Sequence, residues 1–156
     1  MAATTEVEEF LATMLPRQRD AEQALCRGDA RARTATWSRH DPVTLFGAAV
    51  TLRQGWDAVD ATSRAIAERV ADKHLRDYEL QVVAAGADAD LAYTVAFEHK
   101  TFVVDGEPVS YTLRVTHVYR REDGEWRIVH RHGDFPPPGQ DARSPVTSRE
   151  WPASLR

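Results

Sequence analysis

The sequence predicts an α+β fold, in which helices come first and an antiparallel sheet follows. Apolar residues recur at three- and four-residue spacing over most of residues 1–72, as they do on one face of a helix. From about residue 75 apolar and polar residues alternate, which is the pattern of strands with two different faces. Segments rich in glycine and aspartate separate the strand-like stretches and predict turns. This order of elements is typical of α+β domains.

The first predicted helix begins near Thr4 or Thr5 and carries a single apolar stripe. Either threonine can cap the helix, and glutamates in the first turn favour the positive end of its dipole. Pro16 lacks a backbone N–H and predicts a kink or a break into two helices. The sequence Arg-Gly-Asp at residues 27–29 predicts the helix end, and a short second helix is expected up to Trp37. The stripe consists of Val7, Phe10, Leu11, Met14, Ala21 and Leu25.

One strand and a third helix are expected before the main sheet. The strand-like run VTLFGAAV begins after Pro42, and apolar spacing predicts a helix from about Trp56 to Asp72. The connections GADAD, DGEP and EDGE contain the aspartates and glycines of tight turns, so the strands between them are expected to form a meander. These four strands are predicted at residues 75–86, 90–104, 108–122 and 125–134.

Length and composition predict one domain at residues 1–135, followed by a tail at residues 136–156. A chain of 156 residues with 42% hydrophobic and 28% charged residues has the size and composition of a globular domain with a real core. The tail contains several prolines and shows little periodicity, which predicts an extended or disordered segment. Trp151 is its candidate docking anchor.

Charge and cysteine content argue against several classes of protein. The net charge is −4 and lysines and arginines form no block, so no nucleic-acid partner is expected. Cys26 is the single cysteine, which rules out an intrachain disulfide and predicts a small buried residue. The N-terminus lacks an apolar signal core and no segment is apolar enough to span a membrane. A cytoplasmic protein without a membrane partner and without a cofactor is therefore expected.

Three stretches of the sequence resemble the NTF2-like superfamily, also called SnoaL-like or ketosteroid-isomerase-like. They are GDARARTATWSRHDPVTLFG, the Gly-Trp pair at residues 55–56, and RVTHVYRREDGEWRIVHRHGD at residues 114–134. The last is similar to the closing pattern of that superfamily, with Arg-x-Thr, a Gly turn, Trp-x-Ile and a terminal His. The resemblance covers about residues 5–135. It implies a cone of N-terminal helices packed in a strongly curved, mostly antiparallel sheet, with a small-molecule pocket at the open end and homodimers in many members.

Steroid isomerisation, the best-known activity of this superfamily, does not fit the residues of this chain. That reaction requires a carboxylate base, a tyrosine and a protonated acid. The resemblance places the tyrosine at Ala21 and the base at Thr44 or Leu45, which lack the required groups. His117 occupies the position of the acid.

Epoxide hydrolysis of the limonene-epoxide-hydrolase kind fits no better. It requires an arginine and an aspartate two positions apart on one strand. Here the strand reads Arg-Val-Thr at residues 114–116, and threonine cannot replace a carboxylate base. Asp134 could supply one of the two acids, but not both.

Scytalone-dehydratase-like members use histidines and an aspartate for proton transfer, and this chain has the matching residue types. His117 shares a strand face with Leu113 and Val115 and is expected to point inward. Its alternative role is that of a core histidine bonded to a backbone carbonyl. Asp41 has the alternative role of a turn or cap residue. The catalytic candidates are Asp41, His99, His117 and His130.

Strand alternation predicts which further residues face the cone. His99 is in phase with two aromatic residues, and this set is expected to point inward. His130 and His132 are in phase with Trp126, which favours the inside, but a bulge would turn them outward, so their face stays open. This His-x-His pair predicts no metal site, because no glutamate or cysteine ligand accompanies it. The expected ligand contacts are Trp37, Phe46, Trp56, Tyr93, Phe97, Tyr111, Val115 and His132.

The sequence therefore predicts a protein that binds a small hydrophobic or polycyclic molecule in a cone. Proton-transfer chemistry on that molecule, such as dehydration, cyclisation or isomerisation, is the hypothesis for an activity. A non-catalytic dimerisation or scaffold module is the alternative, and a homodimer through the outer face of the sheet is expected in either case. A deep pocket that holds His117 and another titratable group favours an enzyme, whereas a cavity filled by Trp and Phe favours a scaffold.

Overall fold

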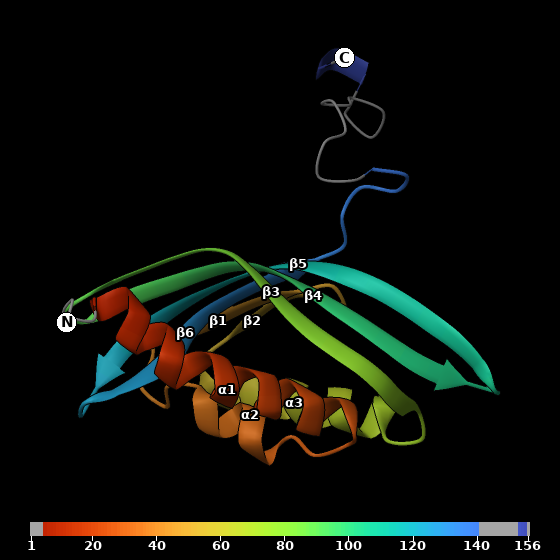
Figure 1. Ribbon diagram of the computed structural model, residues 1–156, viewed down its shortest axis with the longest axis horizontal. Coiled ribbons are helices and arrows are strands. Elements are labelled where there is room, and N and C mark those ends of the chain that lie inside the picture. The colour runs from red at the N-terminus through yellow and green to blue at the C-terminus, as the bar shows by residue number, and fades with distance from the viewer. Residues whose placement is uncertain (1–4, 141–152, 156) are drawn as a thin grey trace.

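The computed structural model describes residues 5–140 and 153–155, and over these residues three α-helices lie against the concave face of a curved six-stranded sheet (Figure 1). The predicted α+β fold is confirmed. The elements are α1 (Glu6–Cys26), α2 (Arg31–Thr36), β1 (Thr44–Gly47), β2 (Val50–Gln54), α3 (Trp56–Val70), β3 (His74–Asp88), β4 (Leu91–Val104), β5 (Glu107–Glu122), β6 (Glu125–Asp134) and a 3-10 turn at Ala153–Leu155.

The strand order β2-β1-β6-β5-β4-β3 joins a short hairpin to a long meander in one sheet. Neighbouring strands run antiparallel, except for β1 and β6, which run parallel. The register shifts twice along β3 and once between β5 and β6. Such bulges bend strands, which accounts for the arch that the sheet forms over the helices in Figure 1.

Two Asp-Gly pairs form two of the three turns of the long meander. Asp105 and Gly106 connect β4 to β5 with φ angles of 51° and 81°, and Asp123 and Gly124 connect β5 to β6 with 49° and 79°. Two-residue turns of this kind need positive φ at both positions, which glycine and aspartate tolerate. The turns predicted from the sequence are therefore confirmed, and so are the four long strands that they separate.

Helix α1 begins with a capping box. The Oγ1 of Thr5 accepts the backbone N–H of Glu8, and the Glu8 carboxylate accepts the backbone N–H of Thr5 at 2.8 Å. The predicted break at Pro16 does not occur, because α1 runs as one element from Glu6 to Cys26. Buried residues on both sides of the proline, such as Met14 and Ala21, anchor the helix and offset the missing hydrogen bond.

The run VTLFGAAV contains the whole of β1, a turn and the first residue of β2, rather than the single predicted strand. Strand β1 ends at Gly47, and β2 begins at Val50, with Gly47 paired to Val50 across the hairpin. The two alanines between them form the turn. Small residues pack little surface on a sheet, so this part of the run gains little from staying extended.

Aromatic residues fill one end of the space between the helices and the sheet. The ring of Phe10 on α1 packs edge-on against Tyr119 of β5 and Trp126 of β6, with centroids 5.0 and 5.3 Å apart. Trp37, which follows α2, is buried in the same cluster. This end of the cone is therefore solid core, and open space is left toward the other end.

Residues 135–140 continue from β6 without helix or strand and extend away from the sheet (Figure 1). Most of the predicted tail, including Trp151, lies outside the described residues, so its extended character stays a prediction. Among the residues that the structure describes, no helix is long and apolar enough to cross a membrane.

Candidate functional site

A cavity of about 550 Å³ lies between the helices and the open end of the sheet. Its walls are mainly apolar and come from α1, α2, α3, the β1–β2 hairpin and the inner faces of β4 to β6. Three of the residues that line it are cations with almost fully buried side chains. They are Arg33, Lys100 and Arg131.

These cations belong to a buried charge cluster that also contains Glu22 of α1 and Glu98 of β4. Both carboxylates are at most 1% exposed. The Nη1 of Arg131 donates to Oε1 of Glu98 at 2.5 Å, and Nζ of Lys100 lies 3.1 Å from the other oxygen of Glu98. The same Nζ lies 3.7 Å from Glu22, whose second oxygen is 3.5 Å from Nε of Arg33. The cluster thus joins α1, α2, β4 and β6 across the floor of the cavity.

Glu98, Lys100 and Arg131 keep their charges at neutral pH. Burial by itself would raise the pKa of Glu98, but Arg131 and Lys100 hold that pKa well below its usual value. Burial by itself would lower the pKa of Lys100, but Glu98 and Glu22 raise it above its usual value. The pKa of Arg131 is raised in the same way by the two carboxylates. The cavity floor is consequently a site of fixed charges.

His117 lies behind this floor and does not line the cavity. Its side chain is buried, and its Nε2 lies 3.1 Å from Nη1 of Arg131. Arginine can only donate, so Nε2 must be the acceptor and the imidazole must be neutral. Burial and the neighbouring Arg131 lower the pKa of His117 well below its usual value, which agrees with a neutral ring. The amide of Gln18 approaches the same nitrogen at 3.4 Å.

The prediction that Tyr93, Phe97 and His99 point into the cone is wrong. The buried residues of β4 are in the other phase and include Glu98 and Lys100. His99 instead contacts Thr112 and Gln81 through its two ring nitrogens, at 2.8 and 2.9 Å, on the opposite face. Strand alternation predicted the wrong inner face for β4, because its inner face carries paired charges and its outer face carries aromatic residues.

A bulge in β6 resolves the orientation of the two histidines near its end. Val118 and Tyr119 of β5 pair with His130 and Ile128, so Val129 is an extra residue. Ile128 points inward before the bulge, and Arg131 points inward after it. His130 and His132 therefore lie on the outer face, where the ring of Phe46 packs edge-on against both, with centroids 5.4 and 5.5 Å away.

The remaining predicted site residues are dispersed. Asp41 accepts the backbone N–H of Trp56 at 3.1 Å, so its carboxylate caps the start of α3, as the alternative interpretation had it. The ring of Trp56 lies under the guanidinium of Arg39, and Trp37 and Val115 are buried in the core. Tyr111 lines the cavity. The structure does not bring the four catalytic candidates together.

Among the described residues, no group of three or more His, Cys, Asp or Glu side chains could hold a metal ion.

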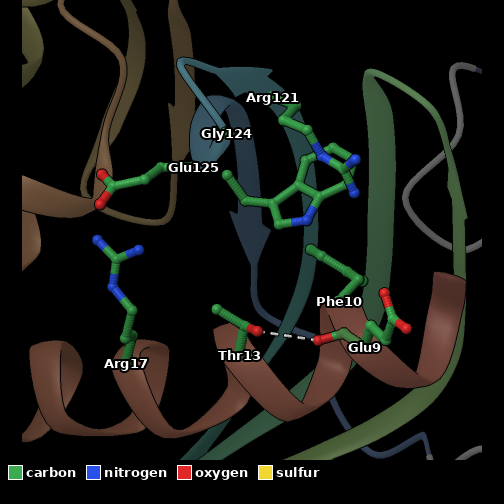
Figure 2. A pocket seen from close by; sticks show the side chains of 8 residues that line it. Glu9, Phe10, Thr13, Arg17, Arg121, Gly124 and Glu125 are labelled. Carbon is green, nitrogen blue, oxygen red and sulfur yellow. Dashed lines mark hydrogen bonds between the residues drawn. The ribbon is translucent and has the colours of Figure 1, made fainter. Parts of the chain in front are cut away.

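A second hollow of about 540 Å³ lies between α1 and the β5–β6 hairpin (Figure 2). Phe10 and Trp126 form its apolar base, and the guanidinium of Arg121 lies 4.4 Å above the Trp126 ring. Its carboxylates, on Glu9 and Glu125, are exposed to solvent, and its arginines, Arg17 and Arg121, are only partly buried, so this hollow has no fully buried charge like those beneath the first cavity. The cavity over Lys100 is the better candidate site for this reason.

Comparisons with known proteins agree with the fold. A family model described as a SnoaL-like domain matches residues 19–138. The structure is similar to an inferred dehydratase of the NTF2-like family from Streptomyces avermitilis, with a TM-score of 0.70 and 16% identity over 83% of this chain and 97% of the other. It is also similar to a ketosteroid isomerase-like protein from Erwinia carotovora atroseptica, with a TM-score of 0.65 and 18% identity over 83% and 98% of the two chains.

A third similar structure has a different assignment. It is an inferred calcium/calmodulin-dependent protein kinase type II association domain from Thiobacillus denitrificans, with a TM-score of 0.61 and 25% identity over 76% of this chain and 91% of the other. A search of curated protein sequences gave no match. The neighbours thus share a fold but not a single function.

Proposed function

The chain belongs to the SnoaL-like family of the NTF2-like superfamily, and from this premise we propose that it binds an apolar small molecule in the cavity over Lys100. The observation that carries the proposal is the cavity itself. Its volume of about 550 Å³ lies within the range of ligand sites, and its walls are apolar with a few polar groups converging at the floor. The aromatic cluster of Phe10 and Trp37 fills the other end of the cone and leaves this space open.

The groups that face the cavity favour stabilisation of negative charge over removal of a proton. Lys100 stays protonated, because the neighbouring carboxylates raise its pKa. Burial raises the pKa of the Cys26 thiol and of the Tyr111 phenol, so both keep their protons at neutral pH. Dehydration, cyclisation and isomerisation next to a carbonyl share an enolate-like oxyanion. If the site is catalytic, Lys100 and Arg131 are the residues that would stabilise that oxyanion.

Blocking the cavity from its rim tests the binding proposal. Ala65 is exposed on α3 and lines the cavity, whereas Ala61 is exposed one turn earlier and does not. We expect 2-naphthaleneethanol to shift the NMR amide signals of Leu113 and Gly133 in the parent protein and in Ala61→Phe. The Ala65→Phe variant should bind at least about tenfold more weakly, because the added ring occupies apolar space. Equal binding by both variants, or no shift at these two amides in the parent, would overturn the proposal.

The alternative function is a non-catalytic dimerisation or scaffold module, and the outer face of the sheet favours it. Leu91, Tyr93 and Val95 share the outer phase of β4 and are 60%, 45% and 37% exposed, and Phe46 of β1 is 41% exposed. Such residues on one face are typical of a surface that a partner covers. The named assignment of the Thiobacillus denitrificans neighbour as an association domain is in line with this alternative.

We expect the parent protein to be a homodimer through this outer face, whichever function applies. Light scattering at tens of micromolar should give twice the chain mass of 17.5 kDa. Val95→Glu should shift the mass toward the monomer, because it places a charge among the apolar residues of this face. Ala61→Glu is the control, since Ala61 is exposed on α3, which packs against the other face of the sheet (Figure 1). A monomer mass for the parent protein would contradict the prediction.

A further inference from the structure

We infer that the ligand of this cavity carries a singly charged oxyanion, such as a carboxylate, attached to an apolar body. The inference rests on the proposed function, because it concerns the same cavity. It adds the chemical class of the ligand, which neither the family nor the structural neighbours specify. Three features of the cavity floor carry it: an excess of positive charge, hydrogen-bond donors without acceptors, and a glycine that leaves one guanidinium uncovered.

The buried cluster is not electrically balanced. Within the described part of the chain it contains three cations, on Arg33, Lys100 and Arg131, and two carboxylates, on Glu22 and Glu98, which leaves one positive charge. His117 adds no charge, because its Nε2 accepts from Arg131. A buried charge without a counter-ion is costly, and one anion in the cavity would supply the missing charge.

Some donors at the floor also have no acceptor among the residues that the structure describes. A guanidinium has five N–H groups, yet among the described residues the side-chain contacts of Arg131, to Glu98 and His117, use Nη1 alone. The Nε of Arg33 is buried without a hydrogen bond, and its nearest carboxylate oxygen, on Glu22, is 3.5 Å away. A carboxylate has two oxygens with several lone pairs and can accept from two such donors at once.

Gly133 leaves the free edge of Arg131 open to the cavity. Gly133 lines the cavity two residues after Arg131 on β6, and both positions lie on the inner face of the strand. A Cβ at position 133 would lie 3.4 Å from Nη2 and 3.5 Å from Nε of Arg131. Any larger side chain at this position would therefore cover Nε and Nη2 of Arg131, the donors that do not contact Glu98 or His117.

The rest of the cavity fits an organic acid better than an inorganic anion. Arg53 and Arg69 line the walls and add positive potential, and among the described residues no aspartate or glutamate lines the cavity. Apolar side chains form most of the remaining wall, including Leu45, Ile66 and Leu113. An anionic group would thus meet the cations, while an apolar body displaces water from the wall.

Three probes with the same naphthyl body and end groups of similar size separate charge from size. Calorimetric titration of the parent protein at pH 7.5 with 2-naphthylacetate, 2-naphthylacetamide and 2-naphthaleneethanol should show the carboxylate bound at least about tenfold more tightly than either neutral probe. If the amide or the alcohol binds as tightly as the carboxylate, the inference is overturned while the proposed function stands. If none of the three binds, the proposed function fails and the inference fails with it.

A substitution of Lys100 tests the origin of the preference. Lys100→Met leaves two cations opposite two carboxylates, so Arg131 keeps Glu98 and Arg33 keeps Glu22. We expect this variant to retain the fold and the binding of 2-naphthaleneethanol, and to lose the preference for 2-naphthylacetate. Lys73→Met removes the other lysine of the chain, which lies outside the cavity, and should keep the preference. A preserved preference in Lys100→Met would contradict the assignment of the excess charge.

A rim substitution gives a second readout should Lys100→Met fail to fold. Arg53 lies on the cavity wall, is only partly buried, and donates to Thr62 at 3.1 Å. Arg53→Met should weaken binding of 2-naphthylacetate several-fold and leave 2-naphthaleneethanol unchanged, because it removes positive potential and little apolar surface. Equal weakening of both probes would count against an anion site.

Discussion

Glu98→Gln is expected to lower the free energy of unfolding by about 3–5 kcal/mol at pH 7, a large share of the stability of an ordinary domain. The substitution keeps the shape of the side chain but removes a carboxylate that is 0% exposed and lies against Arg131 and Lys100. The three buried cations would then face Glu22 alone. Uncompensated buried charge, rather than a lost hydrogen bond, is the cause of the expected loss.

A matched control for this prediction is Glu79→Gln. Glu79 is an exposed residue of β3, so the same chemical change should cost less than about 0.5 kcal/mol. Urea denaturation at a fixed protein concentration measures both variants, because a dimer would make stability depend on concentration. Similar losses in the two variants would show that the cluster of Glu98 does not hold the fold together.

The cost of Glu98→Gln should depend on pH in a defined direction. The folded pKa of Glu98 lies below its usual value of 4.5, so the carboxylate contributes stability that is present above pH 4.5 and is lost as the pH falls toward the folded pKa. The difference between parent and variant should therefore be constant near neutral pH and shrink below pH 4.5. A difference that grows on acidification would contradict the assignment of a paired carboxylate.

Strand boundaries and turns were predictable because local chemistry determines them. The pairs Asp105–Gly106 and Asp123–Gly124 require a turn wherever they occur between alternating segments, and the structure places them there. The inner face of β4 was not predictable from alternation. Residues Glu98 and Lys100 are buried because partners from α1 and β6 neutralise them, and those partners are distant in sequence. Local alternation carries no information about such pairs.

Two features of the site had signals in the sequence that alternation does not use. Gln18 and Glu22 lie at four-residue spacing from Met14 on the apolar stripe of α1, and polar residues on a buried stripe require partners. Arg131 follows a bulge at Val129, and a bulge reverses which residues face inward. The sequence signals that the bulge could occur but not where, because its position depends on pairing with β5.

The cluster also relates the two hypotheses for function. A scaffold that serves dimerisation alone does not need a charged cavity floor, because apolar residues of the same volume would stabilise the fold as well or better. The apolar outer face, with Tyr93 and Val95, serves association without any need for a cavity. Binding inside and association outside thus use different faces of the same sheet, and β4 supplies residues to both.

Replacing His117 is expected to remove an acid-sensitive part of the stability and to disturb the cavity floor. The folded pKa of His117 lies well below 6.5 because the ring is buried and touches Arg131. As the pH falls below 6.5, His117 binds a proton in the unfolded chain but not in the folded protein. The free energy of unfolding of the parent therefore falls by about 1.4 kcal/mol per pH unit through this group. In His117→Gln that loss should be absent, because glutamine does not titrate.

The same pair of variants tests whether His117 positions Arg131. His117→Gln keeps an acceptor near the place of Nε2, whereas His117→Leu leaves Nη1 of Arg131 with Glu98 alone. Binding of 2-naphthylacetate should therefore weaken several-fold in His117→Leu and little in His117→Gln, with both variants folded at pH 7.5. His130→Gln is the control, because His130 lies on the outer face of β6, where its ring nitrogen is hydrogen-bonded to the hydroxyl of Thr44. If His117→Leu binds 2-naphthylacetate as tightly as the parent does, the histidine does not position Arg131. If both variants lose as much stability between pH 6.5 and pH 5 as the parent does, the pKa of His117 is not the cause of that loss.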